Sequence, residues 1–159
     1  MSNIVFGSPT VVSSLGVLTD QPVKFGPETA VYDQFKLSLD DLPKGTKYVL
    51  EAEIVIAESL SAGGLTLLFD TPTVRNIYFD DTGIVRSFGA SGAIRTFPLG
   101  TKIDLRVDVD LAADTWEISL NGSSAHFGSF GGATEIRSIR FSSNNVIAGL
   151  DNLRVTVSP

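Results

Sequence analysis

Hydrophobic and polar residues alternate along several stretches of the chain with a repeat of two residues. The clearest case is residues 102–110, in which every second residue from Ile103 to Val109 is aliphatic and the residues between them are Asp or Arg. Successive side chains of a β-strand point to opposite faces, so this pattern predicts a strand with one buried face. Residues 50–56 start in the same way and then become apolar on both faces, which predicts a more central strand.

Shorter alternating or apolar runs predict the remaining strands. These lie at residues 10–18, 31–39, 64–69, 75–79, 84–88, 93–97, 116–120, 125–130, 136–142 and 153–157. Residues 28–37 can also be written as a short helix, but the alternation of Phe35, Leu37 and Leu39 favours a strand.

Turn signals separate these runs. Asn121-Gly122 is the preferred dipeptide of a type I′ hairpin turn. Residues 80–83 end on Gly83, where a turn requires a positive φ, and residues 111–114 connect two alternating runs. Turns about every 8–12 residues are typical of a sandwich or barrel. We therefore expect an all-β fold with little or no helix.

Length and composition limit the alternatives. A chain of 159 residues predicts a single domain spanning residues 1–159. The absence of cysteine excludes disulfides, thiolate metal sites and a cysteine nucleophile. Twelve basic and 18 acidic residues give a net charge of −6, which argues against a nucleic-acid partner. No apolar run reaches the roughly 18–20 residues of a membrane helix, so we expect no membrane partner.

The amino end is apolar and carries no charge before Asp20. A secretory signal needs a basic start and a continuous apolar segment, and Gly7-Ser8-Pro9 interrupts the apolar residues here, so we recognise no signal peptide. Residues 1–19 are either the first strand of the sandwich or an arm that docks on another subunit, and the strand is the simpler interpretation. We expect the protein outside the cell or on a virion surface.

The last third of the chain has a characteristic order of motifs. Gly100-Thr101 opens a strand that ends at residues 107–110, Trp116 and Asn121-Gly122 follow, and Leu150-Asp151-Asn152 opens the last strand. This order resembles the concanavalin A-like lectin/glucanase superfamily, especially its laminin-G-like and carbohydrate-binding jelly rolls. The resemblance is good over residues 100–157, loose over residues 48–97 and absent at the amino end. It implies a two-sheet antiparallel β-sandwich that frequently binds glycans and a structural calcium ion.

Catalysis would need a suitable pair of carboxylates. Retaining glycosidases hold two carboxyl groups about 5–5.5 Å apart, and Asp108 and Asp110 are the candidates because they share one face of a predicted strand. Catalytic relatives would carry glutamates there, and the alternative is a solvated face with Lys102 and Arg106 interleaved. His126 is the only histidine, which excludes a multi-histidine metal site. We therefore expect no enzyme activity, with a glycoside hydrolase or lyase as the alternative.

Sugar binding would use an aromatic face and planar polar groups. Asn76, Tyr78 and Asp80 share one face of a predicted strand, whereas Trp116 shares its face with Ile118 and is expected in the core. The candidate ligand-binding residues are Asn76, Tyr78, Asp80, Arg86, Arg95, Asn144 and Asn145. Three tyrosines and one tryptophan are few for a strong aromatic platform, which favours weak or multivalent binding.

Two acidic turns are candidates for calcium. Asp151, next to Asn152, occupies the position at which the resemblance places a calcium ligand, and Asp80-Asp81 is the second candidate. The alternative for both is turn chemistry, because Asp and Asn side chains bind their own backbone.

Three functions follow as hypotheses. The leading one is a non-catalytic, lectin-like adhesion module that binds a glycan or cell-surface polysaccharide. The second is a structural decoration, spike or tail domain of a phage-like particle or another assembly, with a homo-oligomer or a capsid or tail protein as partner. The third is a polysaccharide hydrolase or lyase.

Overall fold

The computed structural model describes residues 6–7, 10–11, 23–26, 32–40, 44–72 and 75–159. These residues form strands and turns without a helix, which confirms the predicted all-β class. The strands are β1 (Phe6–Gly7), β2 (Thr10–Val11), β3 (Val23–Phe25), β4 (Tyr32–Ser38), β5 (Lys47–Asp70), β6 (Arg75–Asp80), β7 (Ile84–Ser87), β8 (Ala93–Thr96), β9 (Ile103–Asp110), β10 (Thr115–Leu120), β11 (Ser123–Ser129) and β12 (Ser138–Ser158).

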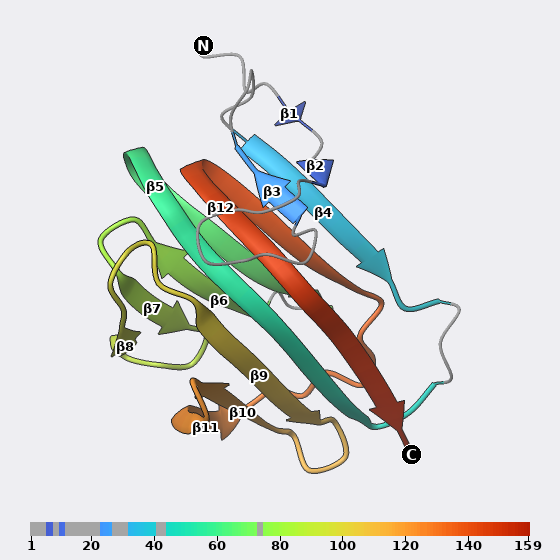
Figure 1. Ribbon diagram of the computed structural model, residues 1–159. Coiled ribbons are helices and arrows are strands. Elements are labelled where there is room, and N and C mark those ends of the chain that lie inside the picture. Colours follow the sequence, from blue (N-terminus) through green and yellow to red (C-terminus); the bar gives the residue numbers. More distant parts are fainter. Residues whose placement is uncertain (1–5, 8–9, 12–22, 27–31, 41–43, 73–74) are drawn as a thin grey trace.

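Two long strands, β5 and β12, organise the whole fold. They run antiparallel, side by side, over almost their full length (Figure 1). The pairing shifts register between Asn144 and Val146 and again between Ile147 and Ala148, where both strands bend. Each strand therefore contributes one half to each of two packed sheets.

The two sheets, called sheet I and sheet II, each contain one half of β5 and one half of β12. Sheet I contains residues 64–70 of β5 and 138–144 of β12, with β4 on one side and β6, β7 and β8 on the other. Sheet II contains residues 47–56 and 148–158, with β3 on one side and β9, β10 and β11 on the other. Except for the parallel pair β1–β4, all pairs are antiparallel. This is the predicted two-sheet jelly roll.

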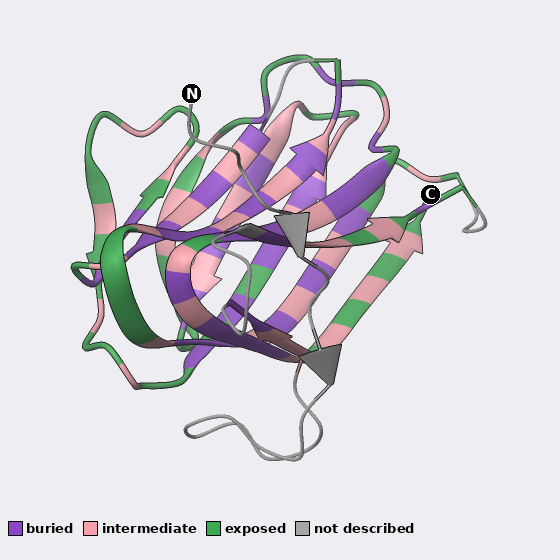
Figure 2. Ribbon diagram, turned by 90° about the horizontal axis from the view of Figure 1, so that it is seen from above, coloured by how far each residue is buried: buried purple, intermediate pink, exposed green. Residues whose placement is uncertain are grey.

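The hydrophobic core lies between the two sheets. The alternation of β9 buries Ile103, Leu105, Val107 and Val109 and leaves the residues between them on the outer face. Figure 2 shows buried residues alternating with less buried ones along many of the strands. Trp116 is buried, as predicted, and its ring packs edge-on against Phe69 of sheet I and against Phe130, which follows β11. Burial of these side chains is the main source of the stability of the fold.

The strand boundaries differ from the prediction at the two bends. The runs 50–56 and 64–69 belong to one strand, and the run 136–142, from Ser138 onward, belongs to the same strand as 153–157. The Gly- and Ser-rich residues between the first two runs look like a turn, but Glu58 and Ser59 stay paired with Ile147 and Val146. Pairing is interrupted at residues 60–63 and resumes at Gly64 with Asn144, so one strand continues around the corner of the sandwich.

Local turn predictions agree with the structure. Asn121 and Gly122 have φ of 51° and 73°, as a type I′ turn requires, and Gly83 has φ of 83°. Residues 32–38 form strand β4 rather than a helix.

Only the two short strands β1 and β2 of the amino end are described. The rest of residues 1–19 lies outside the described residues, so its role as first strand or assembly arm stays a prediction. Within the described part, the chain contains no helix with the length and apolarity to cross a membrane.

Candidate functional site

The outer face of sheet I carries an aromatic ring that packs against the backbone of the neighbouring strand. Ile77 and Phe79 of β6 point into the core, so Asn76 and Tyr78 point outward. The Tyr78 ring lies over Gly64 of the neighbouring strand: a Cβ at position 64 would approach its Cε2 and Cζ atoms within 2.8 and 2.9 Å. The missing side chain at Gly64 therefore provides the space that the ring occupies.

Asp80 and Arg86 stand beside this ring. Arg86 is the register partner of Tyr78, and its guanidinium lies 3.8 Å from Oδ2 of Asp80. Oδ1 of Asp80 accepts hydrogen bonds from the backbone of Thr82 and Ile84 and from the Thr82 hydroxyl. One carboxylate oxygen thus builds the turn, and the other faces the outer surface.

The protonation states of the two groups suit hydrogen bonding. Burial disfavours the charge of Asp80, but the hydrogen bonds from Thr82 and Ile84 outweigh it, so the pKa of Asp80 lies below its usual value. Burial, reinforced by Asp80 and Asp81, raises the pKa of Tyr78. At neutral pH this face therefore presents a carboxylate acceptor beside a phenol that can donate.

Asn144 joins this group from the neighbouring strand. It is exposed and pairs with Gly64, which in turn pairs with Asp80. Five predicted ligand-binding residues therefore share the outer face of sheet I: Asn76, Tyr78, Asp80, Arg86 and Asn144.

Arg95 and Asn145 lie elsewhere. Arg95 pairs with the buried Val85, and its guanidinium donates to the carbonyl of Ser124 at 3.1 Å, so it connects β8 to β11 across the open edge of the sandwich. The amide of Asn145 donates to the carbonyl of Ala62 at 3.2 Å, and its φ of 52° belongs to the bend of β12. Both side chains bind the backbone of another part of the fold, and neither belongs to the group around Tyr78.

Sequence reasoning missed the centre of this face. Arg140 and Ser142 of β12 point outward, because Ile139 and Phe141, which alternate with them along the strand, are buried and point into the core. Ser142 is only 5% exposed, and its Oγ and the Nε of Arg140 are buried without a hydrogen-bond partner in the described part of the chain. Since native proteins pair almost all buried polar atoms, two such atoms on one face are unusual.

We call the outer surface of sheet I the sheet I face. Its outward side chains are Gln34, Lys36, Ser38, Thr66, Leu68, Asp70, Asn76, Tyr78, Asp80, Arg86, Ser138, Arg140, Ser142 and Asn144.

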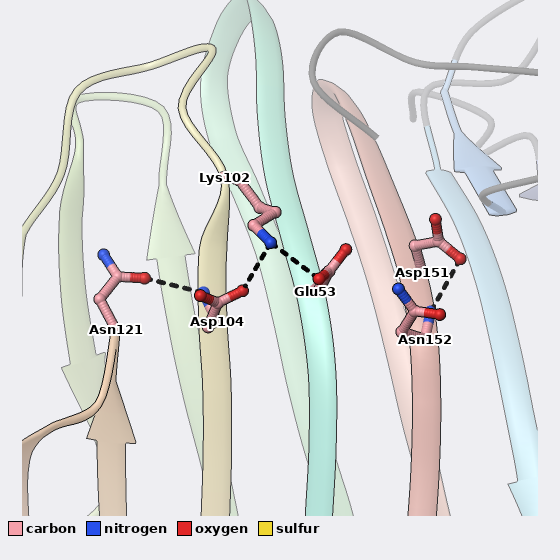
Figure 3. Close-up of polar contacts among 6 residues, drawn as sticks. All are labelled: Glu53, Lys102, Asp104, Asn121, Asp151 and Asn152. Carbon is pink, nitrogen blue, oxygen red and sulfur yellow. Dashed lines mark hydrogen bonds and ion pairs between the residues drawn. The ribbon is translucent and has the colours of Figure 1, made fainter. Parts of the chain in front are cut away.

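The outer face of sheet II is more strongly charged, but its charges neutralise one another. Arg106 binds Glu51 at 2.8 Å and holds Asp108 with two hydrogen bonds of 2.7 Å. Lys102 lies between Glu53 at 2.8 Å and Asp104 at 3.1 Å (Figure 3). Two shallow hollows of about 350 and about 310 Å³ lie over these strands.

The candidate catalytic residues Asp108 and Asp110 belong to this face. The guanidinium of Arg106 donates hydrogen bonds to the carboxylate of Asp108. Asp110 accepts a hydrogen bond from the backbone of Ala113 at 2.9 Å and lies 3.9 Å from Lys47. These partners fit the alternative of a solvated charged strand. The single histidine, His126, packs edge-on against Trp116 on the core side.

The candidate calcium ligands take part in turns. Oδ1 of Asp151 accepts from the backbone of Asn152, whose φ is 50°, where β12 shifts register (Figure 3). Asp80 organises its own turn in the same way. The described residues contain no group of three or more Asp, Glu or His side chains that could hold a metal ion.

The chain was compared with known proteins. No family model and no curated protein matches it. Among solved structures, a sialidase matches 89% of this chain with a TM-score of 0.73 and 11% identity, and the match covers 16% of the sialidase. The endo-β-1,4-glucuronan lyase of the fungus Trichoderma reesei matches 94% of this chain and 87% of its own (TM-score 0.60, 10% identity).

A third similar structure is the carbohydrate-binding module CBM66 from Bacillus subtilis. It matches 70% of this chain and 75% of its own, with a TM-score of 0.53 and 16% identity. At these identities the similarity concerns the fold alone. The expectation drawn from residues 100–157 is confirmed at that level: the chain has the concanavalin A-like jelly-roll fold.

Proposed function

We propose that this protein is a non-catalytic, lectin-like module that binds carbohydrate on the sheet I face. The observation that carries the proposal is the Tyr78 ring, laid against the sheet over Gly64 and flanked by Asp80, Arg86 and Asn144. An aromatic face accepts the apolar C–H face of a sugar ring, and the surrounding polar groups reach its hydroxyls.

The groups around Tyr78 complement a polyhydroxylated ligand. Oδ2 of Asp80, which is ion-paired with Arg86 at 3.8 Å, accepts a hydrogen bond from a sugar hydroxyl, the guanidinium of Arg86 donates one, and the amide of Asn144 does both. Because these side chains come from adjacent strands of one sheet, their spacing is set by the backbone ladder. A single aromatic ring gives weak binding at one site, and the overall avidity for a polysaccharide rises when several copies of the module bind it together.

Three similar folds belong to proteins whose names refer to carbohydrate: a sialidase, a glucuronan lyase and a carbohydrate-binding module. Their names support the ligand class and leave open whether this chain is catalytic. A binding role is favoured because Asp108 and Asp110 are engaged by Arg106, Lys47 and backbone.

The proposal is tested by calorimetric titration with a panel of oligosaccharides. Tyr78→Ala is expected to abolish the heat of binding. Phe127→Ala is the matched control, since Phe127 is 66% exposed and lies on the outer side of β11 in sheet II. Equal loss in both variants, or no saccharide bound by the unmodified protein, contradicts the proposal.

Catalysis is tested on the same panel by chromatography of the products. We expect the saccharides to be recovered intact. Turnover that disappears in Asp108→Asn or Asp110→Asn would identify a hydrolase or lyase and overturn the non-catalytic role.

A further inference from the structure

Two cations lie directly opposite each other at the centre of the sheet I face. Lys36 of β4 is the register partner of Arg140 of β12. Side chains in this position have Cβ atoms about 4.5–5.5 Å apart, and like charges there destabilise the sheet. Within the described part of the chain, no ion pair joins either of them to a carboxylate.

This arrangement is unexpected in a chain with a net charge of −6. On the outer face of sheet II, Lys102 and Arg106 are each neutralised by two carboxylates. The two carboxylates that share the sheet I side are engaged: Asp80 with Arg86, and Asp70 with the hydroxyl of Ser138 at 3.1 Å. Carboxylates are abundant in this chain, and the pair Lys36–Arg140 is left without one.

Donors without partners surround the same point. The Nε of Arg140 is buried and unpartnered among the described residues, and so is the Oγ of the 5% exposed Ser142, two residues further along the same face. On the other side of Arg140 the row continues with Leu68 and then Asn76. Positive charge, unused donors, one apolar side chain and one amide therefore meet in a small area.

We propose that Lys36, Arg140 and Ser142 form a subsite for the carboxylate of an acidic saccharide residue. The guanidinium of Arg140 has the planar fork that matches a carboxylate, and the ammonium of Lys36 adds a point charge. The hydroxyl of Ser142 donates to the same group, and Leu68 supports the apolar face of the sugar. The ligand supplies the negative charge that the protein lacks at this point.

The subsite extends the one around Tyr78 and rests on the proposed function. Arg140 and Tyr78 are separated by two strand spacings of about 4.8 Å and by two residues of about 3.4 Å along the strand, which gives about 12 Å. That distance requires an oligosaccharide rather than a single sugar. The structure thus points to an acidic oligosaccharide that crosses β12, β5 and β6.

The inference is tested by titration with tetrasaccharides of glucuronate, galacturonate and mannuronate, and with neutral and sulfated tetrasaccharides. We expect a uronate to bind at least tenfold more tightly than the neutral sugars, with an affinity that falls as salt is added. Arg140→Gln is expected to weaken uronate binding at least tenfold, because a charge-assisted hydrogen bond is lost. Arg154→Gln, which makes the same change on the same strand in sheet II, is expected to leave binding within twofold.

The outcomes separate the two proposals. Equal binding of neutral and acidic sugars, or no effect of Arg140→Gln, overturns the acidic subsite and leaves the proposed function standing. Preference for sulfated sugars alone overturns the carboxylate assignment, and failure of every saccharide overturns both. Lys36→Gln provides a second variant at an exposed position and is expected to weaken uronate binding while raising the melting temperature of the free protein. A lower melting temperature, or unchanged uronate binding, contradicts the inference.

Discussion

Reversing the charge of Lys36 measures how far the repulsion between Lys36 and Arg140 lowers the free energy of unfolding of the ligand-free protein. In Lys36→Glu the cross-strand repulsion with Arg140 becomes an attraction. Two unit charges about 5 Å apart in water interact by roughly 0.8 kcal/mol, so the reversal is worth at most about 1.6 kcal/mol. Side-chain motion reduces this, and we expect the free energy of unfolding to rise by about 1 kcal/mol, in line with measured cross-strand pairs.

The assay is thermal unfolding in the absence of saccharide at low and high salt. A gain of about 1 kcal/mol corresponds to roughly 2–4 °C in a protein of this size, and salt should shrink it by screening. The matched control is Lys47→Glu, which replaces the ammonium that now lies 3.9 Å from Asp110 with a second carboxylate on the same strand pair and should lower the melting temperature. A Lys36→Glu variant that is less stable, or whose gain is independent of salt, would refute the reasoning.

Two further predictions concern the neighbourhood of Tyr78. Gly64→Ala places a Cβ against the carbonyl of Phe79 and the Tyr78 ring, so we expect urea unfolding to show a loss of about 1–3 kcal/mol and titration to show weaker saccharide binding. Unchanged saccharide binding would mean that the position of the Tyr78 ring does not contribute to the affinity. Asp80 has a lowered pKa in the folded state, so its ionised form stabilises the fold above the usual carboxyl pKa, and this stability is lost as the pH falls below about 4. The stability difference between the unmodified protein and Asp80→Asn should therefore shrink from pH 7 to pH 3, and a constant difference would contradict it.

Alternation along the sequence was sufficient to predict which residues face the core. It separated Ile103 from Asp104 and Tyr78 from Phe79, and it placed Trp116 inside, because these choices depend on the local pleat. The type I′ turn at Asn121-Gly122 followed from the same local information, since both residues must adopt a positive φ.

Strand neighbours could not be predicted in this way, because they are set by contacts between distant parts of the chain. Arg86 and Arg95 are close in sequence and were assigned to one site, but Arg95 pairs with the buried Val85, so it lies on the opposite face from Arg86 and reaches the edge at β11. Arg140 and Ser142 could have been recognised as outward residues. Their significance became visible only when β12 was found between β4 and β5, which brings Lys36 next to Arg140.

The same limit applies to the bends of the long strands. Residues 58–63 contain the small residues of a turn, yet Glu58 and Ser59 pair with β12 and the pairing resumes at Gly64. A partner strand that bends at the same point compensates for the weak local preference, and neither strand alone reveals this.

The central claim, that the sheet I face binds carbohydrate, is tested most directly by nuclear magnetic resonance. Backbone amide shifts of the labelled full chain are followed while an acidic tetrasaccharide is added. The account predicts shifts confined to sheet I, in β4, residues 64–70 of β5, β6, β7 and residues 138–144 of β12, around Tyr78 and Arg140, with β9 and β10 unchanged. Shifts centred instead on the hollows over Glu51, Asp104 and Arg106, or no shifts with any saccharide, would contradict it.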